Sequence, residues 1–413
     1  MKICLFTENQ YRGGLDTFLI NLINAWPNSN DKMTLLCNKS HPGLETITTK
    51  VKKPFDKNYY DRFFTNIFVK FSKDKNKSSF FQIFLVRVFF ILMFQLLQYP
   101  LLFPWYIITL TIFFRRSNFD RLIVVNGGHP ASLLCRCAVI AWKFSGKKTK
   151  AILNFHNYPV APNWLFRLPE YLIDMLVLHS CSYVVGVSKD CINSLKQRAP
   201  FLKSKKILYI HNGIEDPLLN TKVEKRKIYQ HDSMYCLMLA TYEKRKGHNF
   251  LLQAFKIIEK EMPNVFLKIY GYGSKKDYDI VKKIVHKLSL EKKVELNEYS
   301  ENNFDLILNA DLVVVPSQSY ESFGLTIIES MALGVPVVVT DVGGMPEVLA
   351  NSNAGFICPK DDPSKFAEKI KKILKDSNLR EKLKQNGRIA YEKKYTAKIM
   401  SSQYFQLLQD SNI

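Results

Sequence analysis

Short runs of apolar, largely β-branched residues alternate along this chain with segments of helical periodicity. Such alternation is typical of α/β folds with parallel sheets, because each parallel strand needs a crossover connection back to the same edge. Several runs are apolar throughout, as expected of strands that helices cover on both faces. The strands that we predict are Ile3–Thr7, Met33–Cys37, Leu122–Asn126, Ala151–Phe155, Tyr183–Val187, Ile207–Ile210, Tyr235–Ala240, Phe266–Tyr270, Val294–Leu296, Leu312–Val315 and Val335–Thr340.

A polar segment over residues 216–232 separates two sets of predicted strands. Its acidic, then basic, then polar side chains show no apolar period, which indicates a solvated linker. We therefore expect an N-terminal domain over 1–215 and a C-terminal domain over 233–395, followed by a helix over 396–413 that packs back on the first domain. Two parallel-sheet domains of this kind would form a cleft at their strand ends, where such sheets usually bind ligands.

One segment, Val88–Phe114, carries no charged residue. Its length permits a membrane span of about 20 apolar residues, but a single crossing would put strands and their sheet partners on opposite sides of a bilayer. Pro100 and Pro104 also divide it into halves that are each too short to cross. Basic residues flank it, which favours the cytoplasmic side for both ends. Two interpretations stay open: a membrane-associating segment over about residues 80–116, or a pair of helices buried in the first domain.

The chain carries 59 Lys and Arg against 37 Asp and Glu, a formal net charge of +22. This surplus favours a polyanionic partner, such as an anionic membrane surface, a phosphate-bearing substrate or nucleic acid. The basic residues are spread throughout and no RNP-, KH- or zinc-finger-like motif is present, so we expect no nucleic-acid partner. The eight cysteines form no CxxC pair and the first residues do not resemble a secretory signal, so we expect a reduced, cytoplasmic protein.

The densest chemical signal lies between Val315 and Val348, where the pattern predicts strand, loop, helix, strand and a glycine-rich loop. Ser322 is the expected N-cap, so that Gly324, Leu325 and Thr326 would present unpaired N–H groups to an anion. Glu329 would lie about 7.5 Å along the helix, where its carboxylate could bind ribose hydroxyls. Glu321 precedes the helix and can reach beyond the phosphate. This arrangement suits a nucleoside diphosphate that carries a group at its far end.

The pair Glu321 and Glu329, in Glu-Ser-Phe-Gly-Leu-Thr-Ile-Ile-Glu, resembles the E-x7-E motif of the family 4 glycosyltransferases. Pro-Ser before the pair and Gly-Val-Pro-Val-Val-Val-Thr-Asp-Val-Gly-Gly after it match the same family in register. Further similar features are the glycine pair Gly13-Gly14, the turn His211-Asn212-Gly213-Ile214 with Glu215 where Asp is usual, and Lys246-Gly247-His248.

This resemblance implies a GT-B fold, in which two Rossmann-like domains hold a sugar nucleotide in the cleft between them. It also implies transfer with retention of anomeric configuration, without a metal and without a cofactor. Glu329 would bind the ribose, Glu321 the hydroxyls of the donor sugar, and Lys246 the diphosphate. The donor would also contact Gly13 and Gly14 and the backbone of Phe323, Gly324, Leu325 and Thr326.

Two details depart from the family pattern or extend it. The family usually has an Arg five residues before the Lys of the phosphate site, where this chain has Thr241; Arg245 could substitute for it or point elsewhere. His156, at the end of a predicted strand, resembles the active-site His that contacts the reacting sugar. His129, at another strand end, is a further candidate for a contact with the sugar or the acceptor, or it caps the following helix.

From these features we expect a hexosyltransferase that moves a sugar from a UDP- or GDP-sugar to a lipid-linked acceptor. The product would enter a cell-surface polysaccharide such as O-antigen, capsule or exopolysaccharide. The protein would be peripheral or monotopic on the inner face of the cytoplasmic membrane. The alternatives are a soluble GT-B enzyme (a storage-glycan synthase or a sugar-nucleotide epimerase) and a basic polyanion-binding protein.

Overall fold

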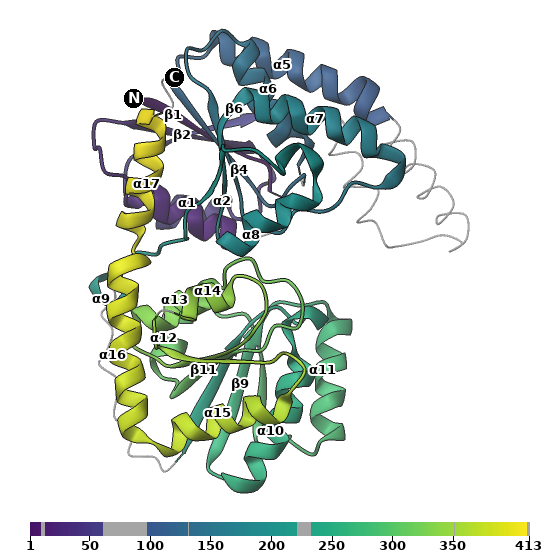
Figure 1. Ribbon diagram of the computed structural model, residues 1–413. Coiled ribbons are helices and arrows are strands. Elements are labelled where there is room, and N and C mark those ends of the chain that lie inside the picture. The colour runs from purple at the N-terminus through teal and green to yellow at the C-terminus, as the bar shows by residue number, and fades with distance from the viewer. Residues whose placement is uncertain (10–12, 61–96, 131, 221–232, 351, 411–413) are drawn as a thin grey trace. The chain divides into compact units, whose positions relative to one another are not determined.

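The computed structural model describes residues 1–9, 13–60, 97–130, 132–220, 233–350 and 352–410 (Figure 1). The chain forms two compact units. Unit 1 comprises Met1–Gly186, Ile192–Tyr209 and the chain from Ser402 onward, and unit 2 comprises Val187–Cys191 and Ile210–Ser401. The chain passes from unit 1 into unit 2 after Tyr209, and the segment 216–232 falls in the range of unit 2, with residues 221–232 outside the described residues.

Unit 1 is built on a parallel sheet whose strands lie in the order β3-β2-β1-β4-β5-β6-β7. The first strand pairs with β2 on one side and β4 on the other, so that Leu5 lies opposite both Leu35 and Ile123. All three side chains are fully buried, which agrees with strands covered on both faces. The strands are β1 (Lys2–Thr7), β2 (Lys32–Asn38), β3 (Asp56–Tyr60), β4 (Arg121–Asn126), β5 (Ala151–Phe155), β6 (Cys181–Gly186) and β7 (Ile207–Tyr209).

Helices cover both faces of this sheet, with α5, α6 and α7 side by side on one face (Figure 1). On the other face α1 meets the end of the chain, where the Phe18 ring lies 5.5 Å from that of Tyr404 in α17. The described helices of this part are α1 (Gly14–Asn24), α2 (Leu44–Lys50), η1 (Gln98–Leu102), α5 (Phe103–Arg116), α6 (Leu133–Phe144), η2 (Trp164–Phe166), α7 (Arg167–Ser180), η3 (Ser194–Gln197) and η4 (Ala199–Phe201). The short helix α8 (Lys189–Asn193) begins in unit 2 and ends in unit 1.

Unit 2 is a second parallel sheet, in the order β10-β9-β8-β11-β12-β13, with helices on both faces. Its strands are β8 (Met234–Leu239), β9 (Val265–Gly271), β10 (Val294–Glu298), β11 (Leu312–Val315), β12 (Val337–Thr340) and β13 (Gly355–Cys358). Its helices are α9 (Pro217–Asn220), η5 (Lys244–Lys246), α10 (His248–Glu261), α11 (Lys275–Lys287), α12 (Asn303–Leu308), α13 (Leu325–Ala332), α14 (Met345–Ala350), α15 (Pro363–Lys375) and α16 (Ser377–Lys394). The last helix, α17 (Ala397–Asp410), begins here and belongs to unit 1 from Ser402 onward.

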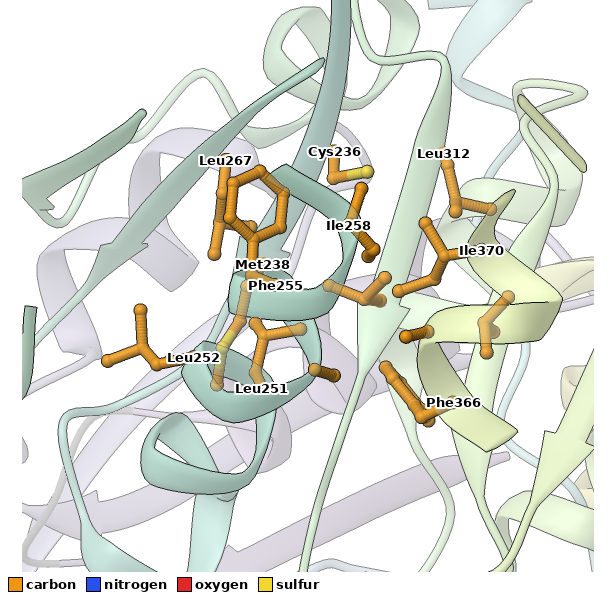
Figure 2. Close-up of a cluster of buried hydrophobic side chains, with 14 of the residues drawn as sticks. Cys236, Met238, Leu251, Leu252, Phe255, Ile258, Leu267, Leu312, Phe366 and Ile370 are labelled. Carbon is orange, nitrogen blue, oxygen red and sulfur yellow. The ribbon is translucent and has the colours of Figure 1, made fainter. Parts of the chain in front are cut away.

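The core of unit 2 lies where α10 and α15 pack on one face of the sheet (Figure 2). Phe255 of α10 and Phe366 of α15 are both fully buried there, against strand residues such as Leu267. On the opposite face a smaller cluster joins Val313 to residues of α12 and the turn after α13. Two buried faces explain why the strand runs in the sequence are apolar at successive positions rather than alternating.

The two parallel sheets confirm the predicted α/β class, but two strands were not predicted. Both β3 and β13 are at sheet edges, and Asp56–Tyr60 has the sequence Asp-Lys-Asn-Tyr-Tyr with mostly exposed side chains. An edge strand needs no continuous apolar run, because solvent reaches one side of it. Gly355–Cys358 is short and begins with a glycine, which likewise weakens the signal.

The uncharged segment Val88–Phe114 is described only from residue 97, where it forms η1 and α5. On α5 the side chains of Phe103, Leu110 and Phe114 are buried, and the Phe114 ring lies 5.3 Å from that of Trp142 in α6. No helix among the described residues has the length and apolar character needed to cross a bilayer.

We expect Phe255→Ala to lower the free energy of unfolding by about 3–5 kcal/mol, because it leaves a cavity in a fully packed core. The change is measured as a lower urea midpoint. Ile280→Ala, on α11 at 48% exposure, is the matched control and should change stability by no more than about 0.5 kcal/mol. Equal midpoints for the two variants would contradict the described packing.

Candidate functional site

The turn from η5 into α10 brings cationic side chains against the loop after β11. Gly247 ends η5 in a left-handed conformation, with φ of 81°. A Cβ atom there would lie 1.9 Å from the carbonyl oxygen of Pro316, so only glycine lets the two loops approach this closely. The amide of Gln318 also donates to the carbonyl of Arg245 at 2.7 Å. The side chain of Lys246 is therefore placed beside the segment that follows β11.

An ion pair between Lys246 and Glu321 occupies this position. The same carboxylate oxygen of Glu321 lies 3.4 Å from the hydroxyl of Ser317 and 3.8 Å from the guanidinium of Arg245. Arg245 in turn donates to Glu243 at 2.6 Å and lies over the ring of Tyr320, 5.0 Å from its centroid. The structure thus brings together the predicted side chains of Lys246, Glu321 and Arg245, and Arg245 also bonds to Glu243.

The helix α13 begins at Leu325, next to these charges. Its N-cap is Gly324, in a left-handed conformation with φ of 88° and no side-chain cap, so the prediction that Ser322 is the N-cap is wrong. The carbonyl of Ser322 instead accepts a hydrogen bond from the Ser188 hydroxyl at 2.6 Å. Leu325 and Thr326 form the first helical turn, whose amides have no acceptor within the helix and can bind an anion.

Glu329 is the fifth residue of α13 and is half-buried. Burial raises the pKa of its carboxyl to about 7, because water is withdrawn from the charged form. Among the described residues no ion pair or hydrogen bond reaches this carboxylate. A partly buried carboxylate without a protein partner is suited to accept hydrogen bonds from a ligand hydroxyl.

In unit 1, His156 directly follows β5. Its amide donates to the carbonyl of Asn126 at 3.1 Å, and its ring meets Phe18 of α1 with 4.5 Å between centroids. Burial lowers the pKa of His156 to about 3, so the imidazole is neutral at physiological pH. A neutral imidazole can donate or accept a hydrogen bond to a sugar hydroxyl without adding charge.

The glycine pair of unit 1 lies at the start of α1, after β1. Gly13 is the N-cap and Gly14 the first helical residue. The Gly13 amide donates to Asp16 at 3.1 Å, and the other oxygen of Asp16 lies 2.9 Å from Nε2 of His41. Residues 10–12, just before the pair, lie outside the described residues.

His129 is fully buried in unit 1, and its Nε2 lies 2.9 Å from the carboxylate of Asp174 in α7. Burial lowers the pKa of this imidazole despite the nearby carboxylate. The ring is therefore held by a side chain of the protein, and a ligand contact by His129 stays a prediction.

Sequence reasoning missed a second anchored carboxylate, Glu347. It lies 2.7 Å from Nε2 of His211 and accepts the amides of Lys189 at 3.0 Å and Asp190 at 3.2 Å. It thereby attaches the short segment Val187–Cys191 to unit 2. The sequence signal for Glu347 was its position three residues after Gly344, within the segment Val315–Val348; the structure places it in the first turn of α14.

Sequence comparisons identify known relatives. The profile described as "Glycosyl transferases group 1" matches residues 221–390. The chain is 30% identical over 316 residues to the capsular polysaccharide biosynthesis glycosyltransferase CapM of Staphylococcus aureus, covering 71% of this chain and 79% of that one. It is 26% identical over 300 residues to the N-acetyl-alpha-D-glucosaminyl L-malate synthase of Bacillus anthracis, covering 72% and 76%.

Solved structures share the same fold. Anabaena HepE, crystallised with UDP and glucose, superposes with a TM-score of 0.72 at 16% identity, over 99% of this chain and 100% of that chain. A glycosyltransferase from Rickettsia africae gives a TM-score of 0.73 at 18% identity, over 99% and 98%. The two-sheet arrangement is therefore the GT-B fold, as the sequence predicted.

We expect Glu329→Gln to stabilise the protein selectively at high pH. In the wild type the carboxyl pKa rises from 4.5 to about 7 on folding, so the folded state binds the proton more tightly and stability falls as pH rises between these values. Glutamine cannot ionise, so the variant should gain about 1–3 kcal/mol over the wild type near pH 8 and little near pH 4. Urea denaturation of both proteins across this range measures the difference, and parallel pH profiles would contradict a buried, uncompensated Glu329.

Proposed function

Because the chain belongs to the group 1 glycosyltransferases, we propose that it transfers a sugar from a nucleoside-diphosphate donor with retention of anomeric configuration and without a metal. The observation that carries this proposal is the ion pair of Lys246 and Glu321 beside the start of α13. The ammonium of Lys246, the carboxylate of Glu321 and the first amides of α13 thus lie in one group of loops in unit 2.

In this proposal the donor diphosphate lies at the first turn of α13. The amides of Leu325 and Thr326 and the ammonium of Lys246 face the oxygens that gain charge when the bond between the anomeric carbon and the diphosphate breaks. Preorganised dipoles and a cation stabilise such a leaving group without the cost of reorganising water. Arg245, whose guanidinium already lies near Glu321, is the second cation that can reach the diphosphate.

The two carboxylates of unit 2 have different partners and therefore different proposed roles. Glu321 is paired with Lys246, and the donor phosphates would compete for that lysine. The released carboxylate then accepts hydrogen bonds from hydroxyls of the donor sugar. Glu329, half-buried and unpaired among the described residues, accepts those of the ribose.

The residues of unit 1 would act on the transferred sugar. Neutral His156 is proposed to contact a hydroxyl of the reacting sugar, and the backbone at Gly13 and Gly14 to approach the donor phosphates. His129 is a further candidate for a contact with sugar or acceptor.

The proposed acceptor is a lipid-linked glycan intermediate at the inner face of the cytoplasmic membrane. Support comes from the uncharged segment Val88–Phe114, from the net charge of +22, and from the capsular role in the name of the Staphylococcus aureus relative. The base of the donor is proposed to be uracil or guanine, and HepE binds UDP.

A soluble acceptor is the second candidate, since the name of the Bacillus anthracis relative specifies L-malate, a small soluble molecule. In that case the donor site of unit 2 would be the same, and the apolar segment would have a purely structural role.

Donor binding tests the site directly. We expect a UDP- or GDP-sugar at 100 times its Kd to stabilise the wild type by about 2.7 kcal/mol, seen as a higher melting temperature. Lys246→Ala should remove most of this shift and of the transfer activity, because the diphosphate loses its cation. Lys244→Ala, an exposed lysine in the same turn, is the matched control and should keep both. Full activity in a well-folded Lys246→Ala protein would refute the assignment.

Acceptor choice is tested by offering polyprenyl-diphosphate-linked sugars and soluble acceptors, including L-malate, with the same donor. We expect transfer to the lipid-linked acceptors. Transfer to soluble acceptors alone would overturn the proposed acceptor and leave the donor site intact.

A further inference from the structure

Helix α7 turns apolar side chains to solvent although it buries both of its carboxylates, which is unusual for a surface helix. Its carboxylates, Glu170 and Asp174, are 5% and 1% exposed. Between its ends, the side chains that it exposes are apolar and follow helical spacing: Leu168, Tyr171, Leu172, Met175 and Leu176, from 40% to 67% exposed. The helix therefore leaves a row of apolar side chains in contact with water.

The buried carboxylates hold α7 in this orientation. Asp174 accepts from Arg198 at 2.7 Å, and Glu170 accepts from Arg136 of α6 at 2.9 Å. Tyr99 of η1 donates to the second oxygen of Glu170 at 2.7 Å. Buried charges are tolerated only when paired in this way, so rotating α7 to bury its apolar face would expose the pairs and break them. The outward apolar face is thus a fixed feature of unit 1.

The apolar face continues beyond α7. Immediately before it, Trp164 and Leu165 of η2 are 80% and 60% exposed. On α5, which packs on α6 as α7 does, the side chains of Trp105, Ile108 and Ile112 are 57%, 55% and 46% exposed. The Tyr99 and Phe166 rings, 5.2 Å apart, join the start of this helix layer to η2.

Tryptophan placement singles out this face. The chain has four tryptophans; Trp26 and Trp142 are buried, and Trp105 and Trp164 are exposed on the surface just described. Tryptophan is favoured where an apolar phase meets water, because its ring is apolar and its N–H is polar. Single exposed apolar side chains are common, but many of them on neighbouring helices indicate an interaction site.

Cations lie at the C-terminal ends of the same helices. Arg115 and Arg116 end α5 and are exposed. At the end of α7, the pKa of His179 is lowered chiefly by the positive charge of Lys143, with Lys150 and Lys206 also close. Exposed carboxylates are absent from the described residues of α5, η2 and α7, since the two on α7 are buried. An apolar face bordered by cations complements an anionic lipid surface and not a second apolar protein face.

We propose that the outward residues of η2, α7 and α5, here called the docking face, bind the surface of a bilayer that contains anionic phospholipids. The apolar side chains enter the interfacial region, and the arginines and lysines at the helix ends meet the headgroups. The inference deepens the proposed function, because a lipid-linked acceptor lies on such a surface, but membrane binding itself requires neither donor nor acceptor.

Vesicle binding by the full chain tests the docking face. We expect the protein to float with vesicles of phosphatidylglycerol and phosphatidylcholine in equal amounts, and far less with phosphatidylcholine alone. Leu168→Asp with Leu172→Asp should lower the partition coefficient at least tenfold, because two inserted side chains become charged. Arg115→Glu with Arg116→Glu should lower it on the anionic vesicles by about tenfold or more.

The matched control is Ile280→Asp with Ile389→Asp, two isoleucines that are each 48% exposed on helices of unit 2; it should bind like the wild type. A second readout introduces no charge into the docking face: brominated lipids should quench the fluorescence of the wild type, and Trp164→Phe should lose a large part of that quenching.

Absence of vesicle binding by the folded wild type would overturn the proposal, and so would equal binding by the Leu168→Asp, Leu172→Asp protein. Self-association that this pair of substitutions abolishes, without vesicle binding, would instead assign the face to a second copy of the chain. These measurements contain no sugar nucleotide, so a negative result would leave the proposed donor site untouched. The donor site is tested separately, by transfer to a soluble acceptor.

Discussion

The ion pair between Lys246 and Glu321 is the interaction on which the donor site of unit 2 depends. It forms because Gly247 lets the loop after β8 approach the carbonyl of Pro316, after β11, more closely than any side chain would permit. The carboxylate balances the lysine, so that the cation is held beside the start of α13. A cation kept in place in this way loses little freedom when a diphosphate arrives, which favours binding.

In unit 1, helix α7 buries its two carboxylates and exposes apolar side chains. Glu170 and Asp174 lie inside, where Arg136 and Arg198 compensate them. Removing Arg198 would leave the buried Asp174 without its arginine, which costs more than the pair contributes. These ion pairs are therefore weak evidence for added stability. Their clearer effect is to fix which side of α7 faces solvent. The same contacts also hold His129, through Asp174, inside the helix layer.

Sequence patterns predicted the parts of this protein that depend on continuous local signals. Strands buried on both faces are apolar at most positions, and β5 and β11 were predicted with their observed bounds. Gly324 shows where local reasoning fails: Ser322 has the favoured side chain for a cap, but a left-handed glycine two residues later begins the helix. In α7, apolar residues lie on both the buried and the exposed side, so periodicity cannot tell which side is buried. Only the arginines that pair with Glu170 and Asp174, distant in sequence, decide that orientation.

The most direct measurement is a crystal structure of the full chain with a bound nucleoside-diphosphate sugar. The account predicts diphosphate oxygens within hydrogen-bond distance of the amides of Leu325 and Thr326, with Nζ of Lys246 turned from Glu321 to the phosphate. It also predicts ribose hydroxyls at the carboxylate of Glu329. A donor bound in another pocket, with the pair of Lys246 and Glu321 unchanged, would contradict it.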